Sequence, residues 1–183
     1  MAASNNYTVK AGEALQASVE AARVRGNPEV IPTHLLVALL DQEEGLAARL
    51  LGKVGVPLAR VHEEARADLD RLPSAKGGAE PAPSRDLRQI MEAASKLAPQ
   101  FQDEYVSVEH LLLALVNVAS SSAAQILARF GVTKDSLLRA IQEVRGSHRV
   151  TDQDPEAKFE ALKKYGRDLT ELAVNMVRAE EMD

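Results

Sequence analysis

Histidine is the residue type in this chain with the widest chemical use, because a neutral imidazole can bind a metal ion or move a proton. The histidines are His34, His62, His110 and His148. No two of them have the spacing of four positions that places paired zinc ligands on one helical face, and the chain has no cysteine to complete a site. We expect no metal ligands, and we expect His34 and His110 to pack and hydrogen bond near helix starts.

A phosphate-binding loop is the second chemistry to consider, because one glycine precedes a Gly-Lys pair. Such a loop needs four residues between the glycines and a hydroxyl residue after the lysine. Here six residues separate Gly45 from Gly52, and Val54 follows Lys53. We therefore expect no bound nucleotide and no other cofactor.

The serine cluster Ser120–Ser122 is the only one that suggests a nucleophile. It lacks the G-x-S-x-G surroundings that expose a catalytic serine on a sharp turn, and no histidine and carboxylate partners can be identified. We interpret it as a turn. The sequence thus offers no catalytic residue, and we expect this chain by itself not to be an enzyme.

Composition narrows the fold and the partners. Aromatic residues make up 3% of the chain, and alanine and leucine dominate, which favours an all-α fold over sheets. The net charge is −5 and acidic and basic residues are interspersed, so we expect neither nucleic acid nor a membrane as partner. The absence of cysteine and of an N-terminal apolar segment favours a cytoplasmic protein.

An internal repeat organises the chain. When the sequence is shifted by 76 positions, the run from Val30 to Leu39 falls on the run from Val106 to Leu115 without a gap, and the histidines of the two runs coincide. This predicts two related halves, repeat 1 at about 8–72 and repeat 2 at about 84–147. Residues 73–83 are rich in Gly, Pro and Ser and predict a flexible, exposed linker.

Each half has the pattern of four short helices. In repeat 1 we expect helices at about 8–25, 32–40, 46–53 and 57–71, with the apolar second helix at the centre. In repeat 2 we expect the same order, with Ser84, Ser107 and Thr133 as caps and with Pro99 and Gly131 as stops.

The two halves should pack against each other, because a four-helix unit of about 60 residues has a marginal core alone. Where the two sequences differ, such a seam can leave an apolar groove, which is a natural binding site. The candidates to line it come from the first helix of each half. They are Ala11, Leu15, Leu87, Ile90 and Met91.

The duplicated run resembles the doubled N-terminal Clp repeat, and residues 159–173 resemble the junction that leads into the first ATPase module of ClpB-type disaggregases. The resemblance implies an all-α domain, residues 1–148, of two pseudo-two-fold-related four-helix repeats. Residues 149–183 would then form a linker and a C-terminal helix that leads towards an ATPase module missing here. Phe159, Leu162, Leu169, Leu172 and Met176 would give that helix an apolar stripe.

The same resemblance implies a function. Members of the family are hexameric ATP-driven chaperones that work with the Hsp70 system, and their N-terminal domain captures unfolded or aggregated polypeptides. We expect the isolated domain to be a monomer. The family pattern points to Thr8, Asp103 and Glu109, although Thr8 also suits a helix cap and Glu109 a helix dipole. The alternative is an adaptor-docking module of a Clp-type protease or unfoldase.

Overall fold

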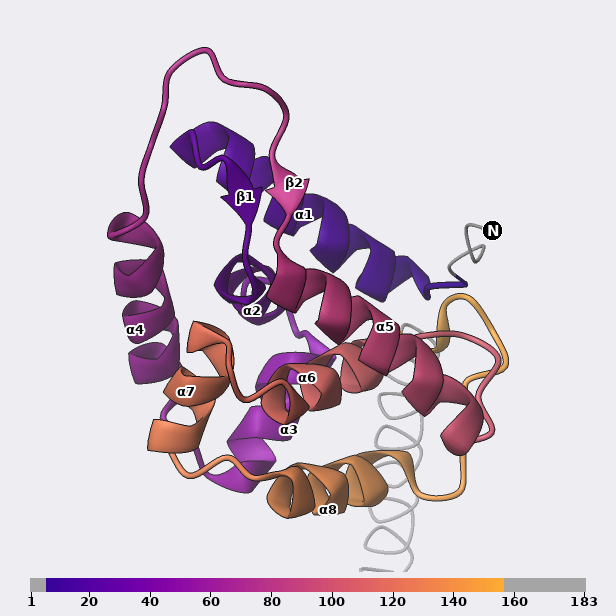
Figure 1. Cartoon of the computed structure of the whole chain (residues 1–183). Coiled ribbons are helices and arrows are strands. Elements are labelled where there is room, and N and C mark those ends of the chain that lie inside the picture. Colours follow the sequence, from indigo (N-terminus) through magenta and orange to yellow (C-terminus); the bar gives the residue numbers. More distant parts are fainter. Residues whose placement is uncertain (1–5, 157–183) are drawn as a thin grey trace, which may run out of the picture. The chain divides into compact units, whose positions relative to one another are not determined.

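The computed structural model describes residues 6–156, and in this range the chain is almost entirely helical (Figure 1). The described part holds eight α-helices in two sets of four, as predicted. In repeat 1 they are α1 (Val9–Arg25), α2 (Pro32–Leu40), α3 (Leu46–Val54) and α4 (Leu58–Asp70). In repeat 2 they are α5 (Arg85–Gln100), α6 (Val108–Asn117), α7 (Ser122–Arg129) and α8 (Lys134–Arg145).

The second helix of each repeat lies at the centre of the core, as its apolar sequence predicts. Every residue of α2 from Pro32 to Leu39 and every residue of α6 from Val108 to Leu115 is buried. The first helices α1 and α5 pack against α2 and α6, and α3 and α7 also contact the opposite repeat. A helix that is apolar on all sides is stable only when neighbours surround it, so the two repeats form one shared core.

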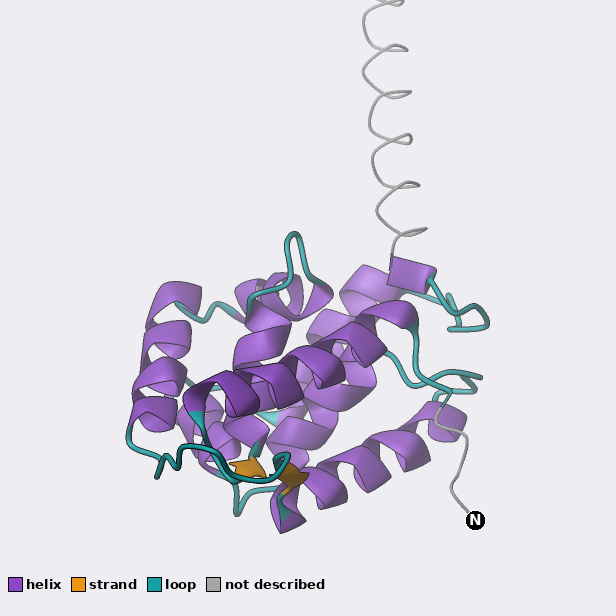
Figure 2. Ribbon diagram, turned by 90° about the horizontal axis from the view of Figure 1, so that it is seen from above, coloured by secondary structure: helices purple, strands orange, loops and turns teal. Residues whose placement is uncertain are grey.

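The segments just before α1 and α5 each pair with a segment of the opposite repeat, which the sequence did not predict. The strand β1 (Glu29–Val30), before α2, pairs in parallel with β2 (Ala82–Pro83), before α5, and both strands appear in Figure 2. Tyr7, before α1, forms the equivalent bridge with Val106, before α6. Each repeat therefore holds the start of the other's first helix through backbone hydrogen bonds.

The linker 73–83 is exposed as predicted, but it is held to repeat 1 and not a free tether. The amide of Ala75 donates to the carbonyl of Gly26 over 2.9 Å, and the Ser74 hydroxyl donates to the carbonyl of Arg25 over 2.8 Å. Gly26 has φ of 70°, and a Cβ there would lie 2.8 Å from Ser74 Oγ. The backbone conformation thus favours glycine, and the linker packed on it leaves no room for a side chain.

Two further boundaries differ from expectation. Pro99 lies inside α5 and does not stop it, because loss of its own N–H affects only the last turn of the helix. The first compact unit of the chain ends at Gln153, beyond the expected boundary at 148, because Val150 is buried. The expected C-terminal helix falls in residues 157–183, outside the described part.

No single helix among residues 6–156 is long and apolar enough to cross a membrane. Together α6 and α7 pass by length and composition, but they are bent by 89° relative to each other. Most of their apolar side chains are buried in the core, which accounts for that composition.

Candidate functional site

The two repeat-related histidines hydrogen bond at the starts of the central helices, as predicted. Nδ1 of His34 accepts the backbone N–H of Ile31 over 2.9 Å, and Nδ1 of His110 accepts that of Ser107 over 2.8 Å. These donors belong to the residues just before α2 and α6. Because Nδ1 accepts, the neutral ring carries its proton on Nε2 and can donate there to a second partner.

The second partners differ between the repeats. Nε2 of His34 donates to the amide oxygen of Asn27 over 3.0 Å, whereas Nε2 of His110 donates to the carboxylate of Asp103 over 2.8 Å. Burial lowers the pKa of His34 to about 4, and burial also lowers the pKa of His110. Both rings are therefore neutral near pH 7.

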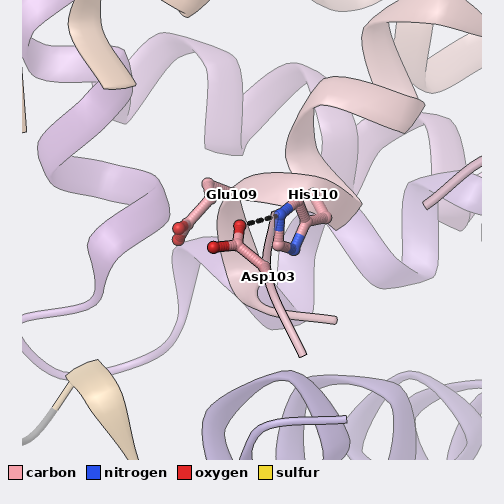
Figure 3. A group of neighbouring side chains, drawn as sticks. All are labelled: Asp103, Glu109 and His110. Carbon is pink, nitrogen blue, oxygen red and sulfur yellow. Dashed lines mark hydrogen bonds and ion pairs between the residues drawn. The ribbon is translucent and has the colours of Figure 1, made fainter. Parts of the chain in front are cut away.

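Around His110 lies a buried cluster of ionisable side chains, of which Figure 3 shows Asp103, Glu109 and His110. We call Asp103, Glu109, His110 and Arg145 the ionic cluster. The guanidinium of Arg145 pairs with both carboxylates, with Asp103 through Nη2 and with Glu109 through Nη1 over 3.2 Å. The side chain of Asp103 is 0% exposed, and those of Glu109 and Arg145 are 7% and 11% exposed.

Repeat 1 has a neutral set of residues at the equivalent positions. Asn27, Thr33 and Leu69 stand 76 positions before Asp103, Glu109 and Arg145. The Thr33 hydroxyl donates to Asp68 over 2.9 Å and also contacts Ser122 Oγ at 2.8 Å. Of the two sets of equivalent positions, only the one in repeat 2 therefore holds a buried cation between two carboxylates.

The ionic cluster brings together three groups that could bind a metal ion. One ligand atom from each of Asp103, Glu109 and His110 lies within 4.8 Å of the others. However, Nδ1 and Nε2 of His110 are both engaged in hydrogen bonds, and Arg145 already compensates the two negative charges. The donor set is thus suited to an internal ion pair and does not fit a metal without displacing Arg145.

The three polar candidates from the family pattern are all buried. Thr8 caps α1, with its Oγ1 accepting the N–H of Ala11 over 3.3 Å, and its own N–H donates to Val106 of repeat 2 over 3.0 Å. Asp103 and Glu109 meet at Arg145. The structure therefore places all three in structural contacts within the domain and unites two of them.

The five apolar candidates divide into two groups. Ala11, Leu87 and Ile90 are at most 2% exposed, so their side chains belong to the core and are not available to line a groove. Leu15 and Met91 are partly exposed and pack against the edge of the core. They also occupy equivalent positions of α1 and α5, since 76 residues separate them.

Sequence reasoning missed Arg145, the residue that unites the ionic cluster. A signal was present, because the fourth helix of repeat 1 has an apolar stripe that ends at Leu69, and the equivalent place in repeat 2 holds an arginine. A charge within an apolar stripe requires a buried counterion.

Comparison with known proteins identifies the relatives of this fold. The Clp repeat (R) N-terminal domain family matches residues 6–130 and 108–164. The chain is 45% identical over 170 residues to the chaperone protein ClpB of Corynebacterium efficiens and 39% identical over 167 residues to that of Bdellovibrio bacteriovorus. These alignments cover 92% and 91% of this chain but 20% of each relative, so the chain spans about a fifth of their length.

Solved structures show the same fold. The Hsp104 N-terminal domain from Candida albicans superposes with a TM-score of 0.71 at 24% identity, over 81% of this chain and 97% of that one. The ClpV N-domain in its complex with a VipB peptide superposes with a TM-score of 0.62 at 18% identity, over 75% of this chain and 85% of that one. The predicted resemblance to ClpB-type chaperones is confirmed.

Proposed function

Because the chain belongs to the Clp repeat N-terminal domain family, we propose that it captures unfolded or aggregated polypeptides for an ATP-driven disaggregase. The observation that carries this proposal is the pair of partly exposed apolar side chains, Leu15 and Met91, at equivalent positions of the outer helices. Misfolded chains differ from native ones mainly by their exposed apolar segments, so an apolar surface is what a capture domain needs.

Capture of a client by Leu15, Met91 and the residues around them is weak and rapidly reversible. Two half-buried side chains and their neighbours offer little area, and a disordered client loses conformational freedom when it binds. Dissociation constants of roughly 10 µM to 1 mM follow from this balance. Weak capture suits a domain that must pass its client on to another part of a machine.

The larger machine is also part of the proposal. We place this chain in the cytoplasm, as a monomer that neither binds nor hydrolyses ATP by itself. As part of a full-length relative it would belong to a hexameric ATPase that cooperates with the Hsp70 system. Neither nucleic acid nor a membrane is proposed as a partner, in line with the mixed surface charge.

The test is an NMR titration of the chain with a reduced and alkylated, permanently unfolded protein. Chemical-shift changes should centre on Leu15 and Met91 and saturate near millimolar client. Leu15→Ser and Met91→Ser should each weaken binding by about 5- to 30-fold, because each removes roughly 1–2 kcal/mol of apolar burial. Circular dichroism should show that both variants stay folded.

Val24→Ser is the matched control. Val24 is the most exposed large apolar residue of α1, at 77%, and lies nine positions after Leu15, on the opposite side of the helix at about 100° per residue. It should leave affinity unchanged. If shifts appear only at charged surface residues and binding depends strongly on salt, client capture is refuted and adaptor docking is the better account.

A further inference from the structure

We infer that the ionic cluster is a latch that holds the segment by which the chain leaves this domain, residues 147–153, and so fixes where that exit lies. We call residues 147–153 the exit segment. Arg145 acts as a positioning residue in this arrangement, since it contacts the segment directly at His148 and also through Asp103.

The exit segment is tied down at Val150. The N–H of Val150 donates to Oδ1 of Asp103 over 2.8 Å, and its carbonyl accepts the N–H of Glu104 over 2.8 Å. The side chain of Val150 is buried, whereas the three residues before it are exposed. A buried residue with both backbone groups bonded, after an exposed stretch, is an anchor point.

Arg145 connects this anchor to the end of α8. Its Nη2 pairs with the same Asp103 oxygen that accepts Val150, and its Nε donates to the carbonyl of His148 over 2.8 Å. The planar guanidinium therefore binds the domain and the exit segment at once through separate nitrogens, whereas a lysine would have to make these contacts from a single nitrogen.

The far end of the exit segment reaches repeat 1. The carbonyl of Gln153 accepts the N–H of Val9 over 2.7 Å, at the first turn of α1, where a helix leaves its N–H groups without internal partners. The segment thus runs from the last helix of repeat 2 to the first helix of repeat 1 and contacts both.

Release would change the reach of the domain. Seven residues span up to about 23 Å when extended and have a root-mean-square length of roughly 15 Å as a flexible chain. Opening the latch would free α1 from the exit segment and would let residues 147–153 extend away from the domain. The value of that reach for client capture rests on the proposed function, but the latch itself does not.

Limited trypsin digestion of the full chain tests the latch. The Arg149–Val150 bond lies in the exit segment, and the exposed Lys76–Gly77 bond of the linker serves as an internal reference. In the wild-type protein the first bond should be cut at least about tenfold more slowly than the second, because a buried, hydrogen-bonded residue must open before cleavage. Arg145→Gln should remove most of that difference.

Two further variants keep the test decisive. Val150→Ser removes the apolar anchor without altering any charge and should also speed cleavage at Arg149. Arg129→Gln removes an exposed arginine that pairs with Glu64 at 3.0 Å and should change nothing. In hydrogen exchange, the amides of Val9, Glu104 and Val150 should lose protection together in Arg145→Gln and Val150→Ser.

The latch is refuted if both bonds of the wild-type protein are cut at similar rates. It is equally refuted if Val150→Ser folds and cleavage at Arg149 changes by less than twofold. Client binding that fails in the titration above, with trypsin results as expected, would leave the latch standing and reject only the proposed function.

Discussion

The buried ion pairs of repeat 2 make a sharp prediction, because repeat 1 supplies its own neutral alternative. Arg145→Leu places in repeat 2 the residue that repeat 1 has at Leu69. It leaves Asp103 and Glu109 as two buried carboxylates without their cation, and their side chains are 0% and 7% exposed. Breaking a buried pair in this way costs about 3–5 kcal/mol, so we expect the free energy of unfolding to fall by about that amount.

The triple variant Asp103→Asn, Glu109→Thr, Arg145→Leu should recover most of that loss. It reproduces the set Asn27, Thr33 and Leu69, and exchanging a whole buried ionic group for neutral partners is often neutral or stabilising. Urea unfolding followed by far-UV circular dichroism measures both variants against the wild type. If the triple variant is no more stable than Arg145→Leu, the cost does not come from unpaired carboxylates, and our account of the cluster is wrong.

Two other predictions concern Gly26, with its repeat-related control Gln102, and His34. Gly26→Ala should destabilise the domain by about 2–4 kcal/mol, because the residue has a positive φ and its new Cβ would clash with the linker. Gln102 stands at the equivalent position of repeat 2 with φ of 60°. Gln102→Ala should cost at most about 0.5 kcal/mol in the same urea assay. The pKa of His34 is about 4 in the folded state and about 6.5 when unfolded, so the unfolded chain binds more protons below pH 6.5 and stability should fall by about 1.5 kcal/mol between pH 6.5 and 5. His34→Gln should flatten that part of the stability profile, and an unchanged slope would contradict the assignment.

The sequence predicted the helices well because each has strong local signals. The offset of 76 placed both central helices and put both histidines near helix starts, whereas three of the five groove candidates, Ala11, Leu87 and Ile90, lie in the core. The backbone pairings that join the repeats, Tyr7 with Val106 and Val30 with Pro83, could not be predicted. Pairings of one or two residues leave no periodicity in the sequence. Why Leu15 and Met91 stay partly exposed while Ala11 and Ile90 are buried also depends on how closely the helices approach one another, which no pattern of one helix contains.

The ionic cluster shows the limit of reading each repeat as a copy of the other. Asp103 and Arg145 lie 42 positions apart, and Asp103 is in a loop, so no helical spacing could pair them. The only signal in the sequence is that Arg145 interrupts the apolar stripe of its helix. This indicates a buried counterion, but only the structure shows which residues provide it.

The difference between the repeats has a physical reason in what each chain does after its fourth helix. After α4 the linker returns to the domain as β2, and backbone hydrogen bonds to β1 hold its end, so neutral side chains suffice nearby. After α8 the chain forms no such strand before it leaves the compact unit at Gln153. Isolated backbone hydrogen bonds hold it instead, from Glu104 to Val150 and from Val9 to Gln153. Asp103 adds a charge-assisted bond to Val150, which is about twice as strong as a neutral one. On this reasoning the buried charges of repeat 2 reinforce the backbone hydrogen bonds that hold its exit segment.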